Sequence, residues 1–268
     1  MADWGLGAGQ SAVAYGYDAA TTAGVTLTSG TANTKGVWAE IIASTTQSSN
    51  WMMVHITNLV SATGYLIDIG IGAAAAEYVL IPDLMVSNGR TKEVGFSVSF
   101  PVHIRSGVRL AARCQAVTAS STCQVSVTAM GSGFAQASPM QRVTAYGTSA
   151  ATSRGADHTP GLNTKPAWVE IVASTANPTK WVVVAHHLRA DTAVVVASRS
   201  IDIGVGAAAA EYVAIPDLRE TAAAIADTPY PGFYGPFPLE LPAGVRLAVR
   251  SSTSATGEND STAVYGID

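Results

Sequence analysis

The carboxylates that could act as acid and base occur as matched pairs, with one member in each half of the chain. The pairs are Asp68 and Asp202, Glu77 and Glu211, Asp83 and Asp217, and Glu40 and Glu170. Two carboxylates across a glycosidic bond can catalyse its hydrolysis, and carboxylates also bind calcium. An Asp beside Gly or after Pro commonly binds turn backbone instead. Because both halves keep these residues, we favour a structural role and predict no catalytic residue.

Histidine and cysteine give little support for a metal or cofactor site. The five histidines, at positions 55, 103, 158, 186 and 187, show no spacing that brings three ligands together. His186 and His187 are neighbours in a predicted strand and should point to opposite faces. Two cysteines are too few for a Cys-rich zinc site, and no Gly-x-Ser-x-Gly nucleophile elbow occurs. We therefore predict no metal and no cofactor.

Cys114 and Cys123 occur only in the first half, and Ser251 stands where Cys114 would recur. They lie at the ends of neighbouring predicted strands joined by a short turn, so a disulfide is sterically conceivable. The first seven residues lack the basic and apolar regions of a secretion signal, and cytosolic thiols stay reduced. The residues leave both a bridge and two free thiols open.

Residues 70–75, Gly-Ile-Gly-Ala-Ala-Ala, nominally fit a dinucleotide-binding fingerprint. A Rossmann unit needs a helix of about ten or more residues before the next strand. Here the apolar run that starts at Tyr78 follows almost at once. We interpret the motif as a structural turn.

One segment of the second half, residues 229–238, has no counterpart in the first and is rich in proline and aromatic residues. Because proline is excluded from sheet interiors, we expect a loop that presents Tyr230, Phe233 and Tyr234. Their rings could stack on a glycan or contact another subunit. The alternative is a rigid turn packed on its own domain.

The elements that must position all these residues are repeated by an internal duplication. Residues 67–79, IDIGIGAAAAEYV, return at 201–213 as IDIGVGAAAAEYV, and Ile-Pro-Asp-Leu follows shortly in each copy. Trp38, Trp51 and residues 107–113 return in the same order as Trp168, Trp181 and residues 244–250. Small and turn-forming residues at 131–139 indicate a linker. We predict two domains, 1–137 and 138–268.

Short runs rich in Val, Ile, Thr and aromatic residues, separated by Gly, Pro, Ser and Asn, are typical of strands. We expect eight or nine strands per copy and read the alanine run as a connection. Residues 51–57 and 181–187 are nearly continuous apolar runs, which indicates strands buried on both faces or packed at an interface. The predicted fold is all-β, with two tandem homologous antiparallel β-sandwich domains of jelly-roll-like form.

Composition restricts the partners. Only 13% of the residues are charged, the net charge is -4, and the 15 Lys and Arg are scattered, so we predict no nucleic-acid binding. No apolar run reaches the 18 or so residues of a membrane span, so we predict no membrane insertion. A surface with so few charges is well suited to packing against other subunits.

The Ile-Asp-Ile-Gly-x-Gly-Ala-Ala-Ala-Ala-Glu-Tyr-Val block resembles tailed-bacteriophage structural proteins. So do the later segments that begin at Phe100-Pro101 and Phe237-Pro238 and run into Gly-Val-Arg-Leu-Ala. The first of these departs from the motif, since Arg105-Ser106 stands where the second has Pro242-Ala243. The resemblance covers about a third of each half. It implies a virion component built of jelly-roll-like domains and brings no catalytic residues.

These observations favour a non-enzymatic virion protein of the tail, collar or capsid surface, assembled in the host cytoplasm with other virion proteins. We expect a homo-oligomer, because a trimer of two-domain chains would present six similar domains. A receptor- or glycan-binding module that uses residues 230–234 is the alternative. A polysaccharide-degrading enzyme based on Asp68 or Glu77 is a third hypothesis.

Overall fold

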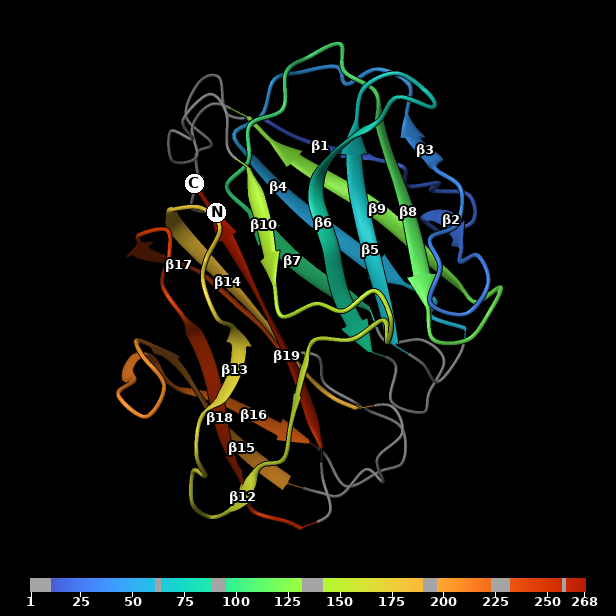
Figure 1. The fold of residues 1–268 in the computed structure, drawn as a ribbon. Coiled ribbons are helices and arrows are strands. Elements are labelled where there is room, and N and C mark those ends of the chain that lie inside the picture. Colours follow the sequence, from blue (N-terminus) through green and yellow to red (C-terminus); the bar gives the residue numbers. More distant parts are fainter. Residues whose placement is uncertain are drawn as a thin grey trace, which may run out of the picture.

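The computed structural model describes residues 11–60, 64–87, 95–131, 142–189, 197–222, 232–256 and 259–268, and all regular elements in these ranges are β-strands (Figure 1). The strands of the first domain are β1 Ala12–Tyr15, β2 Val25–Thr28, β3 Ala39–Ile42, β4 Trp51–Thr57, β5 Gly64–Ile71, β6 Tyr78–Ser87, β7 Phe96–Phe100, β8 Leu110–Ala116 and β9 Thr122–Met130. Those of the second are β10 Val143–Tyr146, β11 Ala156–His158, β12 Gly161–Leu162, β13 Val169–Val172, β14 Thr179–Leu188, β15 Ala197–Val205, β16 Tyr212–Ala222, β17 Gly232–Leu241, β18 Leu247–Thr253 and β19 Asp260–Ile267.

Each domain is a sandwich of two sheets. In the first domain the sheet β1-β9-β4-β7, with β2 also paired to β9, faces the sheet β3-β8-β5-β6. The second domain repeats this as β10-β19-β14-β17, with β11 on β19, facing β13-β18-β15-β16. Every pairing is antiparallel except that of the short strand β12 with β18. The predicted all-β sandwich fold is confirmed, and the strand order is that of a jelly roll.

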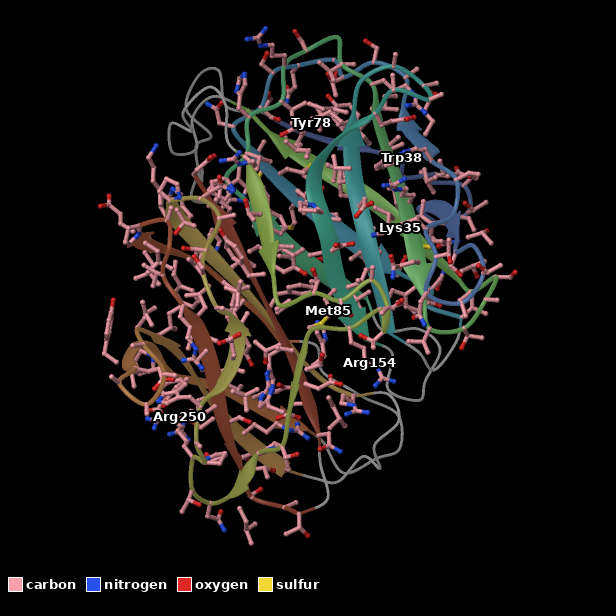
Figure 2. The ribbon with its side chains drawn as sticks, viewed as in Figure 1. Lys35, Trp38, Tyr78, Met85, Arg154 and Arg250 are labelled. Atoms are coloured by element: carbon pink, nitrogen blue, oxygen red, sulfur yellow. The ribbon has the colours of Figure 1, made fainter. Side chains whose placement is uncertain are left out.

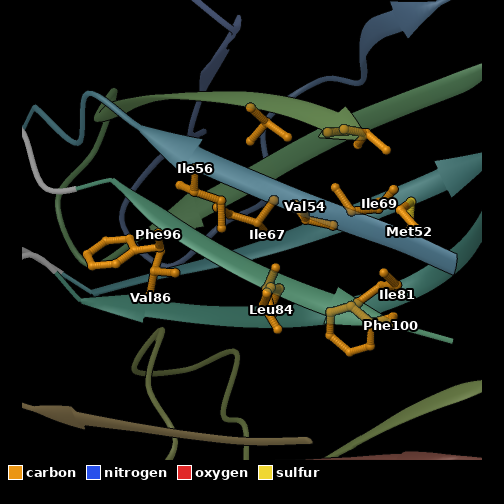
Figure 3. Close-up of a cluster of buried hydrophobic side chains, with 14 of the residues drawn as sticks. Met52, Val54, Ile56, Ile67, Ile69, Ile81, Leu84, Val86, Phe96 and Phe100 are labelled. Carbon is orange, nitrogen blue, oxygen red and sulfur yellow. The ribbon is translucent and has the colours of Figure 1, made fainter. Parts of the chain in front are cut away.

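The sheets form because side chains alternate between core and exterior along each strand. In β4, Met52, Val54 and Ile56 are fully buried, whereas their neighbours Trp51 and His55 face outward. Figure 3 shows the inward side chains of β4 meeting those of β5, β6 and β7 between the two sheets. The predicted boundary near residue 137 lies in residues 132–141, outside the described part, and stays a prediction.

The second domain packs the outer face of β14 and β19 against β6 and β7 of the first. Met85 lies between the domains (Figure 2). Its N–H donates to Tyr265 Oη at 2.7 Å, and its carbonyl oxygen accepts from His187 Nε2 at 2.9 Å. The Tyr265 hydroxyl donates to the carbonyl oxygen of Asp83 at 2.8 Å. These hydrogen bonds pair backbone groups of β6, which is an edge strand of its sheet. The prediction that residues 181–187 form a strand packed at an interface is confirmed for β14.

The corresponding surfaces, the edge strand β16 of the second domain and the outer face of β4 in the first, lack the residues that form this interface. Arg219 corresponds to Met85, but its carbonyl oxygen accepts a hydrogen bond from Tyr234 of its own domain at 3.2 Å. On the outer face of β4, polar His55 replaces the Ala185 that packs at the interface. Neither surface therefore carries the residues that make the contact between the two domains. No helix in the described ranges has the length and apolar character needed to span a bilayer.

Candidate functional site in the core of the second domain

One end of the second domain's core is polar where the same end of the first domain is apolar. Three cross-strand pairs change together. The pairs Leu27–Cys123, Ile56–Val125 and Tyr65–Val86 of the first domain correspond to His158–Asp260, His186–Thr262 and Arg199–Glu220 of the second. All twelve side chains are buried. We call the six polar residues of the second domain the buried polar cluster.

The two carboxylates of the cluster lie between a guanidinium and an imidazole. Arg199 Nε is 3.5 Å from Asp260 Oδ1, and Arg199 Nη1 is 3.9 Å from Glu220 Oε1. On the other side, His186 Nε2 is 3.3 Å from Asp260 Oδ2 and 3.8 Å from Glu220 Oε2. The rings of His158 and His186 are 5.5 Å apart, centre to centre. Strands β11, β14, β15, β16 and β19 thus bring two carboxylates, two imidazoles and a guanidinium together.

Burial and neighbouring charges together shift the pKa values of the cluster. The pKa of His158 falls to about 4, because an imidazolium would be desolvated there and would repel His186. Burial acts to raise the pKa of Asp260, but the interactions with His186 and Arg199 outweigh it and hold the pKa below its usual value. Asp260 is therefore an anion inside a protein core.

Such a cluster is costly to bury. Placing charges inside a core costs several kcal/mol per ion, and apolar replacements of ion pairs are often neutral or stabilising. The first domain shows that this fold accommodates an apolar version at the same positions. Groups with perturbed pKa values gathered at one place mark candidate functional sites. We therefore take the buried polar cluster as the candidate site.

The expectation that no three metal ligands come together is wrong for this cluster. One ligand atom each from His158, His186 and Asp260 lies within 4.8 Å of the others. Strand pairing joins residues that are far apart in the chain, which spacing alone does not reveal. The expectation that His186 and His187 face opposite ways is confirmed, since His186 enters the cluster and His187 the domain interface.

The aromatic segment is a strand and not the predicted loop. Tyr230 lies outside the described residues, whereas Phe233 and Tyr234 belong to β17. β17 is an edge strand, where prolines are tolerated at positions whose N–H is not needed for pairing. The Phe233 ring packs edge-on against His187 at 5.5 Å, and burial raises the pKa of Tyr234. Both side chains therefore contact their own chain.

Cys114 and Cys123 are both free thiols in the core of the first domain. They are on β8 and β9, which belong to opposite sheets and not to one hairpin as the turn between them suggested. A hydrogen bond with Cys114, together with burial, raises the pKa of Cys123. A buried thiol with a raised pKa is a poor nucleophile.

The repeated carboxylates are bound by basic side chains of their own domain. Asp68 accepts hydrogen bonds from Lys35 Nζ at 2.7 Å, from Arg113 Nε at 2.9 Å and from the N–H of Asp83 at 2.9 Å. In the second domain, Asp202 binds Lys165, Arg250 and Asp217 in the same way. These contacts tie strands of one sheet together, as a structural role requires.

Glu40 and Glu77 are joined by one arginine. Arg109 Nε is 2.8 Å from Glu40 Oε2, and Arg109 Nη1 is 2.8 Å from Glu77 Oε1. Arg246 links Glu170 and Glu211 in the same manner. In both domains the arginine ties the turn after β5 or β15 to the neighbouring strands.

The glycine motif is a turn, as predicted. The segment after Ile71 turns back directly into β6, without a helix. Gly204 has a separate reason to be glycine, because a Cβ there would lie 2.7 Å from the ring of Trp168. The Arg250 guanidinium also lies over this ring, 4.3 Å from its centroid. Packing against the tryptophan explains this glycine without a bound nucleotide.

Comparison with known proteins adds little. No family model and no curated protein matches the chain. Among solved structures, PNGF-II is similar, at 8% identity over 96% of this chain and 65% of that chain, with a TM-score of 0.33. The CBM22-1–CBM22-2 tandem domain of Paenibacillus barcinonensis Xyn10C is similar at 10% identity over 99% and 94%, with a TM-score of 0.26. Both similarities are too weak to carry a function to this chain.

Proposed function

We propose that this chain is a non-enzymatic structural component of a bacteriophage particle, in its tail, collar or capsid surface, and that it assembles with copies of itself and with other virion proteins. The proposal rests on an exposed apolar surface that each domain presents once. We call these two surfaces the repeat patches: residues 73–76 with Tyr78, and residues 207–210 with Tyr212. Tyr78 is visible at the end of the first domain in Figure 2.

The fold does not require the residues of the repeat patches. Their alanines are exposed, and the tyrosines are 57% and 61% exposed for Tyr78 and Tyr212. Ala75 and Ala209 have φ values of 64° and 61°, a region in which glycine or asparagine is favoured over alanine. Core residues recur because the core requires them, but the fold gives no reason for exposed apolar residues at an unfavourable φ to recur. A binding partner shared by both domains gives such a reason.

The interface between the domains supports the same proposal. Three interdomain hydrogen bonds at β6 and an apolar contact fix the relative placement of the two repeat patches. A unit with two like contact surfaces at a fixed separation suits symmetric assembly.

The test combines mass in solution with the location of the protein. We expect the full chain to form a defined oligomer in analytical ultracentrifugation and to be detected by antibody labelling on purified particles. Replacing both patch tyrosines, Tyr78→Ser with Tyr212→Ser, should weaken the oligomer. Tyr17→Ser, which removes a 52% exposed tyrosine outside the patches, should not. A stable monomer that is also absent from purified particles would overturn the proposal.

Glycan binding is a second candidate, favoured by a hollow of about 430 Å³ at the second repeat patch. Trp168, Glu211 and Arg246 line it. Arg250 already stacks on Trp168, so the 61% exposed ring of Tyr212, next in the chain to the lining residue Glu211, is the ring that would stack on a sugar. A glycan array should then give a signal that Tyr212→Ala abolishes and Tyr17→Ala retains. An array without signal above background removes this candidate.

A further inference from the structure

We propose that His158, His186 and Asp260 form a binding site for a divalent transition-metal ion of the zinc class. The site is independent of the proposed function and belongs to the second domain alone. Its three residues occupy the positions of Leu27, Ile56 and Cys123 in the first domain.

The two imidazoles are oriented as metal ligands are. His158 Nδ1 donates to the carbonyl oxygen of Ala156 at 3.3 Å, and His186 Nδ1 is hydrogen-bonded to Thr262 Oγ1 at 2.8 Å. Metal-binding histidines are commonly held in this way by their second nitrogen. Both Nε2 atoms are buried and have no hydrogen-bond partner among the described residues. His158 Nε2 therefore directs a lone pair into the core, and His186 Nε2 does so in the tautomer whose Nδ1–H donates to Thr262.

The carboxylates complete the ligand set. Asp260 Oδ2 is 3.3 Å from His186 Nε2, about the separation of two ligands that share a tetrahedral ion at bond lengths of about 2.0–2.2 Å. All three ligand atoms lie within 4.8 Å of one another, so a small side-chain rotation brings His158 into the same shell. Glu220 Oε2, 3.8 Å from His186 Nε2, is placed as a fourth ligand. Two imidazoles with carboxylate oxygens suit zinc and its neighbours.

The carboxylates of the cluster face an arginine on one side and a histidine on the other. Arg199 carries one positive charge and faces two carboxylates, those of Asp260 and Glu220. Both carboxylates are buried, and burying a carboxylate is unfavourable unless it is paired or binds a metal ion. Arg199 contacts Asp260 Oδ1 and Glu220 Oε1, whereas Asp260 Oδ2 and Glu220 Oε2 face His186 Nε2. Ser251 Oγ also donates to Asp260 Oδ2 at 3.4 Å. A divalent ion between these oxygens and the two Nε2 atoms is thus opposite to the guanidinium.

The burial of the ligands indicates a structural ion and not a catalytic one. His158, His186 and Asp260 are each at most 5% exposed. Catalytic metal ions keep a coordination position open to substrate, whereas structural ions are enclosed and bind as the chain folds. The ion would take the place of the apolar contacts that hold this end of the first domain together.

The test is metal analysis of the full chain, carrying no histidine tag, expressed in zinc-supplemented medium and also refolded with Zn²⁺ or Co²⁺. We expect about one ion per chain, and a Co²⁺ spectrum with d–d bands but without a thiolate charge-transfer band. His158→Leu and His186→Ile install the first domain's residues and should abolish binding. Thr262→Val, which copies Val125, removes only the hydroxyl that holds His186 and should lower affinity about 10- to 100-fold.

His55→Ala is the matched control, because this histidine binds Ser97 and Thr128 on the outer face of the first domain and should leave the metal content unchanged. Circular dichroism of each variant separates loss of the ion from loss of the fold. The wild-type measurement stands even if a variant fails to fold. Absence of metal from the wild-type chain after both expression and refolding, or metal content retained by folded His158→Leu, would overturn the proposal.

Discussion

Acidification should weaken the interface between the domains through His187. Its Nε2–H donates to the carbonyl oxygen of Met85, and its Nδ1 has no hydrogen-bond partner among the described residues. Burial, and then the neighbouring His186, lower the pKa of His187 from 6.5 to about 3. Arg154 and Arg189, which both pair with Asp157, line the small cavity beside the ring. The folded chain therefore keeps this imidazole neutral.

The sign and the size follow from linkage. Below pH 6.5 the unfolded chain takes up a proton that folded His187 refuses until about pH 3. The stability that comes from His187 is therefore complete above pH 6.5 and is lost as the pH falls toward 3. At about 1.4 kcal/mol per pH unit, the loss between pH 6.5 and pH 5 is about 2 kcal/mol.

His187→Gln separates this contribution from the rest. The glutamine amide can donate to the same carbonyl of Met85 but does not titrate. Urea unfolding followed by tryptophan fluorescence at pH 7 and pH 5 should show that the variant loses about 2 kcal/mol less than the wild type on acidification. His158, whose pKa is also lowered, keeps its own share in both proteins. Equal losses in wild type and variant would refute the reasoning.

Three other predictions concern packing. Tyr265→Phe leaves a buried N–H and a C=O of β6 without their partner and should lower the free energy of unfolding by about 1–3 kcal/mol in urea titration; an unchanged value contradicts the interface. Gly204→Ala places a Cβ against Trp168 and should destabilise by about 1–3 kcal/mol, read as a lower Tm. Cys114 and Cys123 should resist a thiol reagent in the native chain and react fully after unfolding without reductant; two unreactive cysteines after unfolding would indicate a disulfide.

The sandwich was accessible from the sequence because its signals are local. The apolar runs of β4 and β14 and the glycines that follow β5 and β15 depend only on neighbouring residues, and duplication displays each signal twice. The run of β4 did not reveal that this strand is buried on one face only. The failure at β17 has a tertiary cause. Prolines 236 and 238 argued for a loop, but the strand lies at the edge of its sheet, and its register with β14 shifts at irregular points. The sequence of a segment does not show whether its strand will lie at the edge of a sheet.

The candidate site can be recognised from the register of the paired strands but not from the spacing of residues along the chain. His158 and His186 are isolated in the sequence, and only pairing with β19 brings them to Asp260 and Thr262. A signal was nevertheless present. Once the two halves are aligned strand by strand, histidine falls opposite Ile56, where a core residue must stand. Substitution of an apolar core position by an ionisable residue in one copy of a duplicated domain is a usable search criterion.

The two copies also separate requirements of the fold from additions to it. What both domains share at buried positions, such as the ion pairs of Asp68 and Asp202, is explained by the sheet that these residues hold together. The buried polar cluster is unshared and costly, so the sheet does not explain it. β14 forms one wall of that cluster through His186 and part of the domain interface through His187. An ion bound at the cluster would therefore also hold the strand that pairs with the edge of the first domain, and would link the second domain's unusual core to the packing of the two domains.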